Sequence, residues 1–403
     1  MRGNTSPLLS RLERQLASRK AAGKLRQIQV KFNPSIHVDF SSNDYLGLAR
    51  SEKLAKRVEA THSAWIKAQP KGVPLLGSTG SRLLTGNSPL YMGTEAFLAH
   101  FHGYKHALLA NSGWCLNYGL LACIGGKAGN TLIFYDELAH NSLVIGARTA
   151  GLNALPFAHN NVAALDAALK RAPQQGEASE RLVVVESVYS MDGDTCPLQG
   201  VLDVAAQHGA MVLVDEAHGT GVLGPRGEGL VGKLKLQRHP SLLGVVHTFG
   251  KAVGAHGAVL VTDHASLVDT LANYSAPLVY SSSLPAASLS ALREAYKEME
   301  TSFKAREKLT QLVAEFRGEC AKYGLPMLGS LTPIQAILCP GNDRVKRVST
   351  LLLEQHAMSC LPIRAPTVPA GKERLRVVLH AYNTTEEVRI LVRGVAEALD
   401  QLE

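Results

Sequence analysis

Short runs of apolar, β-branched residues, separated by helical stretches, constrain the fold of this 403-residue chain most strongly. Between residues 107 and 263 the runs are ALLANSG, NTLIFYDE, RLVVVESVYS, GAMVLVDEAH, LLGVVHTFGK and GAVLVTD. Their lengths are those of strands, and segments with helical periodicity, such as Val162–Arg171 and Leu198–His208, lie between them. Strands that are apolar on both faces and alternate with helices indicate a mostly parallel sheet covered on both sides. The sequence therefore predicts an α/β fold.

The length of the chain predicts more than one domain, because it exceeds what a single hydrophobic core usually supports. We expect residues 1–55 to form an N-terminal helix, over about Pro7 to Arg26, and an arm. Residues 56–300 are predicted to form the large sheet domain. Residues 301–403 are predicted to form a smaller C-terminal α/β domain, with a strand that begins near Arg374. A charged helical segment from Ala286 to about Tyr323 is expected to join the two.

The charge balance excludes some classes of partner. Lys and Arg total 42 against 34 Asp and Glu, and the excess of +8 is spread along the chain. A nucleic-acid-binding surface would cluster this charge, so we do not expect that role. A mildly basic surface suits an anionic substrate, such as an acyl-coenzyme A or an acidic carrier protein. No apolar run approaches the roughly 18 residues of a membrane span, so none is predicted.

The six cysteines form no CxxC pair and no regular spacing, which is typical of buried thiols in a reducing compartment. The N-terminal segment MRGNTSPLLSRLERQLASRK has no apolar core of a signal peptide. It is basic and contains serines, so an organellar transit peptide remains an alternative to an ordinary amphipathic helix. We expect a cytoplasmic protein.

Polar residues with complementary chemistry follow two of the predicted strands. VLVDEAHGTG carries Asp215 and His218, and HTFGKAVG carries Lys251 between small residues. Because the carboxyl ends of parallel strands meet at one edge of a sheet, these side chains are expected to lie close together. A carboxylate, an imidazole and an amine are what a pyridoxal phosphate (PLP) site needs. The amine binds the cofactor aldehyde and the carboxylate keeps the pyridine nitrogen protonated.

Each of these motifs also has an ordinary explanation. Lys251 could be a surface lysine after a strand, and Asp215 could belong to a solvated turn. The small residues around Lys251 argue against the first alternative, because desolvation there would lower the pKa of the amine. A nucleotide-binding phosphate loop is excluded, because Gly244 and Gly250 enclose five residues instead of four and Ala252 follows the lysine.

Further motifs extend the predicted site. Ser112–Gly113–Trp114 begins an apolar helix, whose free N–H groups would favour a phosphate, although many helices begin in this way. His140 follows a predicted strand and could stack on a flat cationic ring, or could be an ordinary buried or surface histidine. HFHGYKH resembles a metal site, but it lacks a carboxylate or thiolate at ligand spacing. We therefore expect no metal, and attribute these histidines to the context of a charged helix.

Taken together, six ordered motifs resemble those of the α-oxoamine synthase family: SNDYLGLA, DELAHNS, ESVYSMDGD, VDEAHGTGVLG, TFGKA and VYSSSLPAA. The resemblance covers the chain from about Leu16 to the C-terminus. It implies a PLP-dependent transferase of fold type I, in which residues 56–300 bind the cofactor. It also implies condensation of a small amino acid with an acyl-CoA, followed by loss of carbon dioxide, in a homodimer whose subunits share the active site.

The resemblance assigns roles to individual residues. The catalytic residues that it implies are Lys251, His140, Asp215 and His218. The cofactor-binding residues that it implies are Gly113, Trp114, His140, Ser190, Asp215, His218, Thr248, Lys251, Ser281 and Ser282. In this assignment Lys251 binds the aldehyde, Asp215 faces the ring nitrogen and His140 stacks on the ring. The stretch Tyr280–Ser282 would reach the phosphate of the neighbouring subunit.

Within the family, the sequence is most similar to the members that condense L-alanine with pimeloyl-CoA to give 8-amino-7-oxononanoate for biotin. The implied substrate-binding residues are Arg26, Asn43, Thr367 and Arg376, of which Arg376 would hold the amino-acid carboxylate. Two alternatives stay open: condensation of glycine or serine with another acyl-CoA, and a non-catalytic paralogous subunit.

The sequence also departs from the family pattern. Thr79 stands where the family usually has glycine, and Ala365 stands where proline is common. The histidine usually found just upstream of Glu95 is absent. These departures bear on the choice of acyl group more than on the chemistry.

Overall fold

The structure is a computed structural model that describes residues 6–22, 25, 26, 28, 38–125, 131–172 and 180–402. Contacts divide the chain into two units, residues 1–37 and 38–403. In the first unit, α1 (Pro7–Ala21) begins with a proline and ends in Arg19 and Lys20, where basic residues favour a helix C-terminus. The predicted N-terminal helix is confirmed, but it ends before Arg26.

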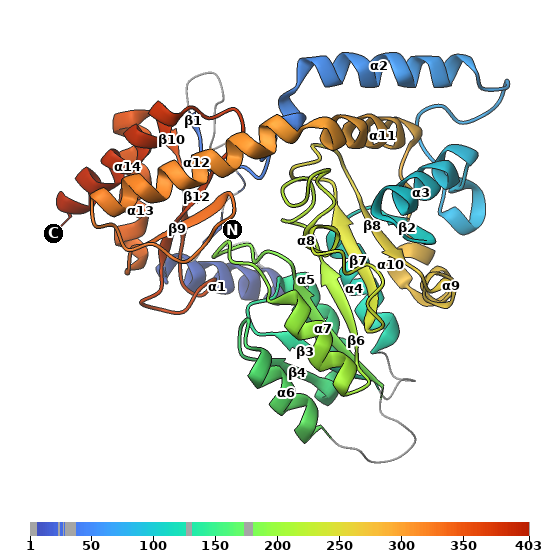
Figure 1. Ribbon diagram of the computed structural model, residues 1–403, viewed down its shortest axis with the longest axis horizontal. Helices are drawn as coiled ribbons and strands as arrows, with labels where there is room; N and C mark the ends of the chain where they lie inside the picture. The colour runs from blue at the N-terminus through green and yellow to red at the C-terminus, as the bar shows by residue number, and fades with distance from the viewer. Residues whose placement is uncertain are drawn as a thin grey trace. The chain divides into compact units, whose positions relative to one another are not determined.

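A seven-stranded sheet forms the centre of the second unit (Figure 1). Its strands, in spatial order, are β2 (His106–Ala110), β8 (Ala258–Thr262), β7 (Leu242–Thr248), β6 (Met211–Asp215), β5 (Arg181–Glu186), β3 (Leu132–Asp136) and β4 (Ala154–Phe157). The strands from β7 to β4 are parallel, and β8 runs antiparallel to both of its neighbours. The predicted mostly parallel sheet is therefore confirmed.

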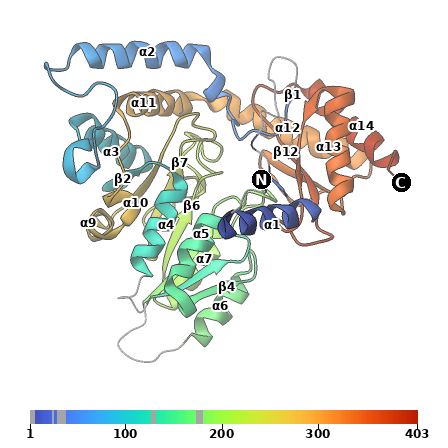
Figure 2. The ribbon, with the colours of Figure 1, turned by 180° about the vertical axis from the view of Figure 1, so that it is seen from behind.

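Helices cover both faces of this sheet, because its strands bury alternate side chains on opposite sides. In β5, Leu182 and Val184 pack with α4 (Gly113–Ile124), α5 (Asn141–Ala147) and α9 (Ala265–Tyr274). Val183 and Val185 of the same strand pack on the other face with α3 (Pro89–His102), α6 (Val162–Arg171), α7 (Leu198–Gln207) and α11 (Ala286–Thr301). Figure 2 shows α4, α5 and α9 from the side opposite to that of Figure 1. The other α-helices among the described residues from 38 to 301 are α2 (Glu52–Lys67), α8 (Leu230–Lys233) and α10 (Ala276–Val279).

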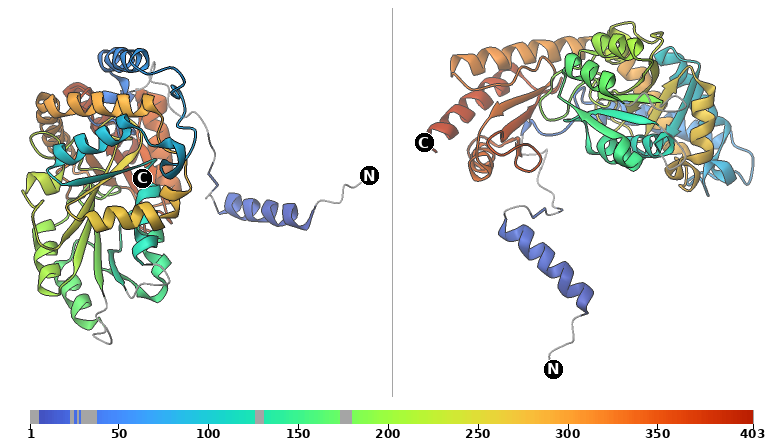
Figure 3. Two further views of the ribbon diagram at one scale, coloured as in Figure 1. Left: turned by 90° about the vertical axis from the view of Figure 1, so that its right-hand side faces the viewer. Right: turned by 90° about the horizontal axis from the view of Figure 1, so that it is seen from below.

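A second, smaller core lies in the C-terminal part of the chain. The predicted charged helical segment forms two helices, α11 and α12 (Phe303–Lys322), which run on from the large sheet to this core (Figures 1 and 3). An antiparallel sheet of β11 (Leu361–Ile363), β12 (Arg374–Val378) and β9 (Ile334–Leu338) packs with α13 (Asn342–His356) and α14 (Thr385–Asp400). β12 begins at Arg374, as predicted.

The short segment from Val38 to Tyr45 contributes to both cores. β1 (Val38–Asp39) pairs with β10 (Met358–Ser359), and Phe40 is fully buried in the smaller core. Five residues later, Tyr45 is fully buried in the larger core. The proposed boundaries at residues 55 and 300 stay predictions. None of the helices in the described ranges is long and apolar enough to cross a membrane.

Candidate active site

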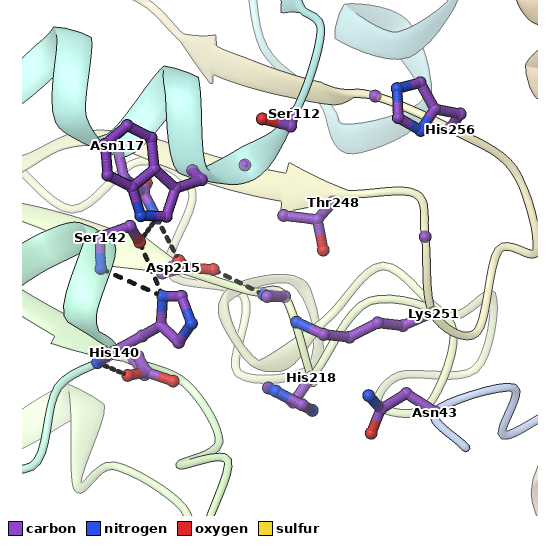
Figure 4. Close-up of a pocket in the computed structure, with 16 residues that line it drawn as sticks. Asn43, Ser112, Asn117, His140, Ser142, Asp215, His218, Thr248, Lys251 and His256 are labelled. Carbon is purple, nitrogen blue, oxygen red and sulfur yellow. Dashed lines mark hydrogen bonds between the residues drawn. The ribbon is translucent and has the colours of Figure 1, made fainter. Parts of the chain in front are cut away.

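A cavity of about 270 Å³ lies at the carboxyl ends of β3, β5, β6 and β7 (Figure 4). This is the edge at which the sequence predicted the chemistry. Most of the predicted site residues line it, namely Asn43, Gly113, Trp114, His140, Asp215, His218, Thr248 and Lys251. The fold therefore brings together side chains that are up to about 200 residues apart in the sequence, because parallel strands end side by side.

Asp215, the last residue of β6, is held rigidly at the base of the cavity. Its Oδ2 accepts a hydrogen bond from Asn117 Nδ2 at 2.7 Å, and its Oδ1 accepts one from the Ala217 amide at 2.8 Å. Asn117 Nδ2 also donates to Ser142 Oγ at 3.0 Å. Asp215 is only 3 % exposed. A buried carboxylate of this kind is stable next to a cation, and a protonated ring nitrogen would supply one.

Lys251 extends from the turn after β7 into the cavity, toward Asp215 (Figure 4). Burial lowers the pKa of its amine, although the carboxyl groups of Asp215 and Glu186 oppose this shift. The turn needs Gly254, whose φ is +68° and whose added Cβ would lie 2.5 Å from the Ala49 amide nitrogen. An amine with a lowered pKa can act as a nucleophile and as a base near neutral pH.

His218 is buried beside the lysine and is fixed by a tyrosine. Its Nδ1 shares a 2.6 Å hydrogen bond with the Tyr45 hydroxyl, which also donates to Asn43 Oδ1 at 3.3 Å. Burial, with smaller contributions from Lys251 and Arg376, holds the pKa of His218 well below its usual value. Burial raises the pKa of Tyr45 to about 12. Both groups are therefore neutral and act as hydrogen-bonding groups rather than as charges.

His140 is fixed at the start of α5, where its side chain caps the helix. Its Nδ1 accepts from the Ser142 amide at 3.3 Å and lies 2.8 Å from Ser142 Oγ. Its own amide donates to Glu186 Oε1. Burial lowers the pKa of the His140 ring, and burial together with the charge of Asp215 raises that of Glu186 well above its usual value. The imidazole thus faces the cavity in a neutral form and in one orientation.

The other end of the cavity is built to receive a phosphate. Gly113 begins α4, a helix of twelve residues capped by Ser112, whose Oγ accepts from the Cys115 amide at 3.2 Å. Thr248 Oγ1 is buried and has no hydrogen-bond partner among the described residues. A Cβ on Gly113 would lie 2.4 Å from Thr248 Cγ2, so only glycine fits there. Free helix N–H groups beside an unpaired hydroxyl fit the phosphate of PLP.

Arg376 and Ser190 lie just behind the cavity. Arg376 Nε donates to the Ser190 carbonyl at 2.7 Å, and its Nη2 donates to Asn43 Oδ1 at 3.1 Å. The arginine therefore meets the cavity through Asn43. The contact of Ser190 runs through its backbone and not through its hydroxyl.

Thr367 and the serine pair lie outside the cavity. Thr367 lines a second cavity of about 550 Å³, together with Ala139 and Asn141 on either side of His140. Asn111 Nδ2 donates to Ser281 Oγ at 3.2 Å and to the Ser282 carbonyl at 2.7 Å. Arg26 is exposed and belongs to residues 1–37, the separate first unit.

Sequence reasoning did not single out Asn117, Tyr45 or Glu186. Asn117 could have been found, because it lies four residues after Gly113 and therefore on the same face of α4. Of the three histidines of HFHGYKH, which were attributed to a charged helix, His100 and His102 lie on α3 and His106 begins β2. His102 is buried, stacks on His247 at 3.6 Å and hydrogen-bonds the Tyr296 hydroxyl, so it is a core residue. No group of three or more potential metal ligands occurs in the described part of the chain.

Known proteins resemble this chain over nearly its whole length. The family model "Aminotransferase class I and II" matches residues 35–395. An 8-amino-7-oxononanoate synthase from Chromohalobacter salexigens is 35% identical over 98% of both chains. Serine palmitoyltransferase from Sphingomonas wittichii has a similar structure, with a TM-score of 0.85 and 27% identity over 98% of this chain and 99% of that one. A structure of serine palmitoyltransferase with PLP also has a TM-score of 0.85, at 25% identity and the same coverage.

The geometry of the cavity and these likenesses agree. The chain belongs to the class I and II aminotransferase family and, within it, to the α-oxoamine synthases, which are PLP-dependent enzymes of fold type I.

Proposed function

We propose that this protein condenses L-alanine with pimeloyl-CoA, releases coenzyme A and carbon dioxide, and forms 8-amino-7-oxononanoate in biotin biosynthesis. Relatives named 8-amino-7-oxononanoate synthase, at 35% identity over 98% of the chain, support this choice within the family. The single observation that carries the chemistry is the Lys251 amine, which reaches toward Asp215 in a cavity backed by the Arg376 guanidinium.

Arg376 supports the proposal that the site binds an amino acid. The residue is 3 % exposed, and within the described ranges its guanidinium donates to the Ser190 carbonyl and to Asn43 but pairs with no carboxylate. A buried guanidinium without an anionic partner is costly, and a substrate carboxylate would provide one in a geometry suited to its paired N–H groups. Asn43, which lines the cavity and accepts from Arg376, lies between the guanidinium and the cavity, so the carboxylate would bind beside it.

Lys251 would act twice. It would bind the cofactor aldehyde between turnovers and, once displaced by the substrate amine, would take the proton from the amino-acid Cα. When bound, PLP supplies a ring that accepts the electron pair left on this carbon, both after proton removal and after loss of carbon dioxide. Asp215, held by Asn117 and the Ala217 amide, would keep the ring nitrogen protonated. His140 would hold the ring plane by stacking on it.

The second cavity suits the acyl donor. It begins at Ala139 and Asn141, beside His140, and it includes Thr367 and the basic side chains of Arg148 and Lys372. These two cations would attract the phosphates of coenzyme A. The thioester carbon would then approach the amino-acid carbon past His140.

The other candidate substrates are glycine and serine with a different acyl-CoA. The structural likeness to serine palmitoyltransferase, with a TM-score of 0.85, favours serine among these. The test is release of free coenzyme A from a panel of alanine, glycine and serine with pimeloyl-CoA, palmitoyl-CoA and succinyl-CoA. We expect the fastest release with alanine and pimeloyl-CoA. Release with glycine or serine, and none with alanine, would overturn the proposal.

We also propose that the protein is a homodimer whose subunits complete each other's sites. The stretch Tyr280–Ser282 supports this, because Tyr280 is 85 % exposed although it is a large aromatic residue. Leu76 and Leu84 are exposed to a similar degree, and large exposed apolar side chains are typical of an interface. In the dimer, Ser281 and Ser282 would reach the phosphate held by the partner subunit.

A further inference from the structure

His159 lies between two carboxylates close to the active site. Its Nδ1 is 2.8 Å from Asp136 Oδ1, and its Nε2 is 2.7 Å from Asp194 Oδ2. Carboxylates only accept hydrogen bonds, so both ring nitrogens must carry a proton. The geometry alone therefore makes His159 an imidazolium that joins two acidic side chains.

The residues around His159 fix the position of its ring and stabilise its positive charge. Glu137 Oε1 accepts from the His159 amide at 3.1 Å, and the ring of Tyr189 meets the imidazole edge-on at 4.4 Å. Asp136 is fully buried, and its Oδ2 also accepts from the Asn160 amide at 2.9 Å. Hydrogen bonds to the two aspartates outweigh burial and raise the pKa of His159 to about 10.

One of the two aspartates belongs to a tight hairpin over residues 187–196. The hairpin closes by pairing of Val188 with Thr195 and by a 3.0 Å hydrogen bond from the Tyr189 amide to the Asp194 carbonyl. Its tip contacts the smaller sheet, because the Ser190 carbonyl accepts from Arg376 and Asp192 pairs with Arg374. The position of Arg376 thus depends on this hairpin.

The other aspartate belongs to the segment that carries His140. Asp136 ends β3 and lies four residues before His140, and its Oδ1 also accepts from the Leu138 amide at 2.9 Å. His159 itself follows β4. A single imidazolium therefore joins the ends of two parallel strands to the hairpin that touches Arg376.

We propose that His159 is a positioning residue that holds the 187–196 hairpin, and through it Arg376, in register with His140 for amino-acid binding. This inference rests on the proposed role of Arg376 as the carboxylate-binding residue. A loosened hairpin would leave Lys251 and Thr248 in place, but it would misplace Arg376 and the part of the second cavity that Tyr189, Met191 and Asp192 line.

The test is His159→Gln in the PLP-loaded enzyme. We expect the KM for the amino acid, and its Kd from a spectral titration of the bound cofactor, to rise by about tenfold or more, because small misplacements of a binding group are costly. We expect kcat to change by less than about threefold and the visible spectrum without substrate to be unchanged. An unchanged KM and Kd would overturn the proposal.

A matched control is His208→Gln. His208 Nε2 makes the same kind of contact, 2.7 Å to Asp166 Oδ1, but this pair joins α6 and α7 away from the cavity. We expect the control to lower the melting temperature without changing the amino-acid KM. An equal rise in KM in both variants would show a general loss of stability and would overturn the positioning role.

A second variant tests whether the effect of His159→Gln comes from loss of positioning or from repulsion between Asp136 and Asp194, which lose their shared cation. In His159→Gln with Asp194→Asn, one negative charge is removed together with the imidazolium. We expect the double variant to regain stability but to keep the raised KM, whereas a normal KM would contradict the proposal. Where His159→Gln does not fold, Asp194→Asn alone gives the same readout.

The substrate assignment can fail without affecting this test. The titrations use whichever of alanine, glycine and serine the wild-type enzyme binds. Binding of glycine but not alanine would overturn the proposed substrate, while the ratio of Kd values between His159→Gln and wild type would still decide the role of His159.

Discussion

At the scale of single residues, burial sets the charge state of nearly every group in the active site. Burial lowers the pKa of Lys251, His140 and His218 and raises that of Glu186. The amine and both imidazoles therefore favour their neutral forms, while Asp215 keeps two hydrogen-bond donors. The site thus offers one carboxylate to a cationic ring and, to an aldehyde, one amine that burial makes easier to deprotonate.

Replacing Lys251 with alanine tests the first of these roles. We expect kcat to fall by at least about a hundredfold, because a positioned acid–base group contributes roughly 10² to 10⁴ in rate. We also expect borohydride to fix no cofactor to the variant, since Lys251 is the only lysine among the described residues that line the cavity. Borohydride treatment followed by mass spectrometry measures this directly. Labelling of the variant at the wild-type level would contradict the assignment.

Thr248 allows the phosphate end to be tested separately. Because its hydroxyl is buried without a partner, Thr248→Val should leave the stability of the cofactor-free protein unchanged or higher. The same change should weaken PLP binding by about tenfold or more, because a hydrogen bond to a charged group is lost. Fluorescence titration with PLP measures this, with Thr248→Ser as the control that keeps the hydroxyl. Equal PLP affinity in the valine and serine variants would exclude Thr248 from the phosphate site.

At the scale of elements, Thr79 has a backbone conformation that its side chain disfavours. Its φ is +64°, in the region where glycine is normal and a β-branched residue is strained. The sequence pattern had already marked this position, because the resembling family usually has glycine here. The Thr79 hydroxyl donates to Thr85 Oγ1 at 2.9 Å, which offsets part of the strain.

We expect Thr79→Gly to raise the free energy of unfolding relative to Thr79→Ala by about 1 kcal/mol. Both variants lose the hydrogen bond to Thr85, but only glycine relieves the backbone strain. Urea unfolding of the two variants, compared with each other, isolates this effect. A less stable glycine variant would show that the loop does not adopt this conformation in solution.

The contacts of His159 predict a dependence of stability on alkaline pH. The pKa of this group is raised from 6.5 to about 10 in the folded protein, so its stabilising contribution is complete below pH 6.5. The contribution decreases as pH rises and is lost above about pH 10. The difference in unfolding free energy between wild type and His159→Gln should therefore shrink between pH 7 and pH 10.5. A difference that stays constant over this range would mean that His159 is not charged.

The elements themselves could be predicted from sequence wherever the pattern was long. The six apolar runs all became strands, because short runs that are apolar on both faces fit a sheet that helices cover on both sides. β4 was missed, because ALPF is four residues long, contains a proline and is only partly buried. The end of α1 was predicted too late, because the charged residues up to Arg26 do not oppose a helix by themselves.

At the scale of the whole molecule, the site residues that follow strands could be predicted, and those held by tertiary contacts could not. Asp215, His140 and Lys251 were found because parallel strands bring their carboxyl ends together. Tyr45 was not assigned a role, because its contact with His218 spans 173 residues and depends on how the chain crosses between the two cores. The contacts of His159 with Asp136 and Asp194 were not predicted for the same reason, since each of these residues looks ordinary in the sequence.

The proposed dimer predicts complementation between two inactive subunits. Lys251→Ala lacks the amine, and a variant with both Ser281→Ala and Ser282→Ala lacks the contact to the partner. In a randomly assorted mixture, half of the dimers are mixed and each holds one intact site, so we expect about a quarter of wild-type activity. Coenzyme A release before and after mixing measures this. Activity of the mixture equal to the mean of the two variants measured alone would show that Lys251 and the two serines act in the same subunit.

Between Phe40 and Tyr45 the backbone is anchored at each end in a different hydrophobic interior, with only four residues to span the interval. Asn43 lies within that interval, bonded to Arg376 on one side and to the tyrosine on the other. The peptide that joins the larger core to the smaller core therefore also lines the active-site cavity. Any movement of one core relative to the other would displace Asn43 and change the shape of the cavity.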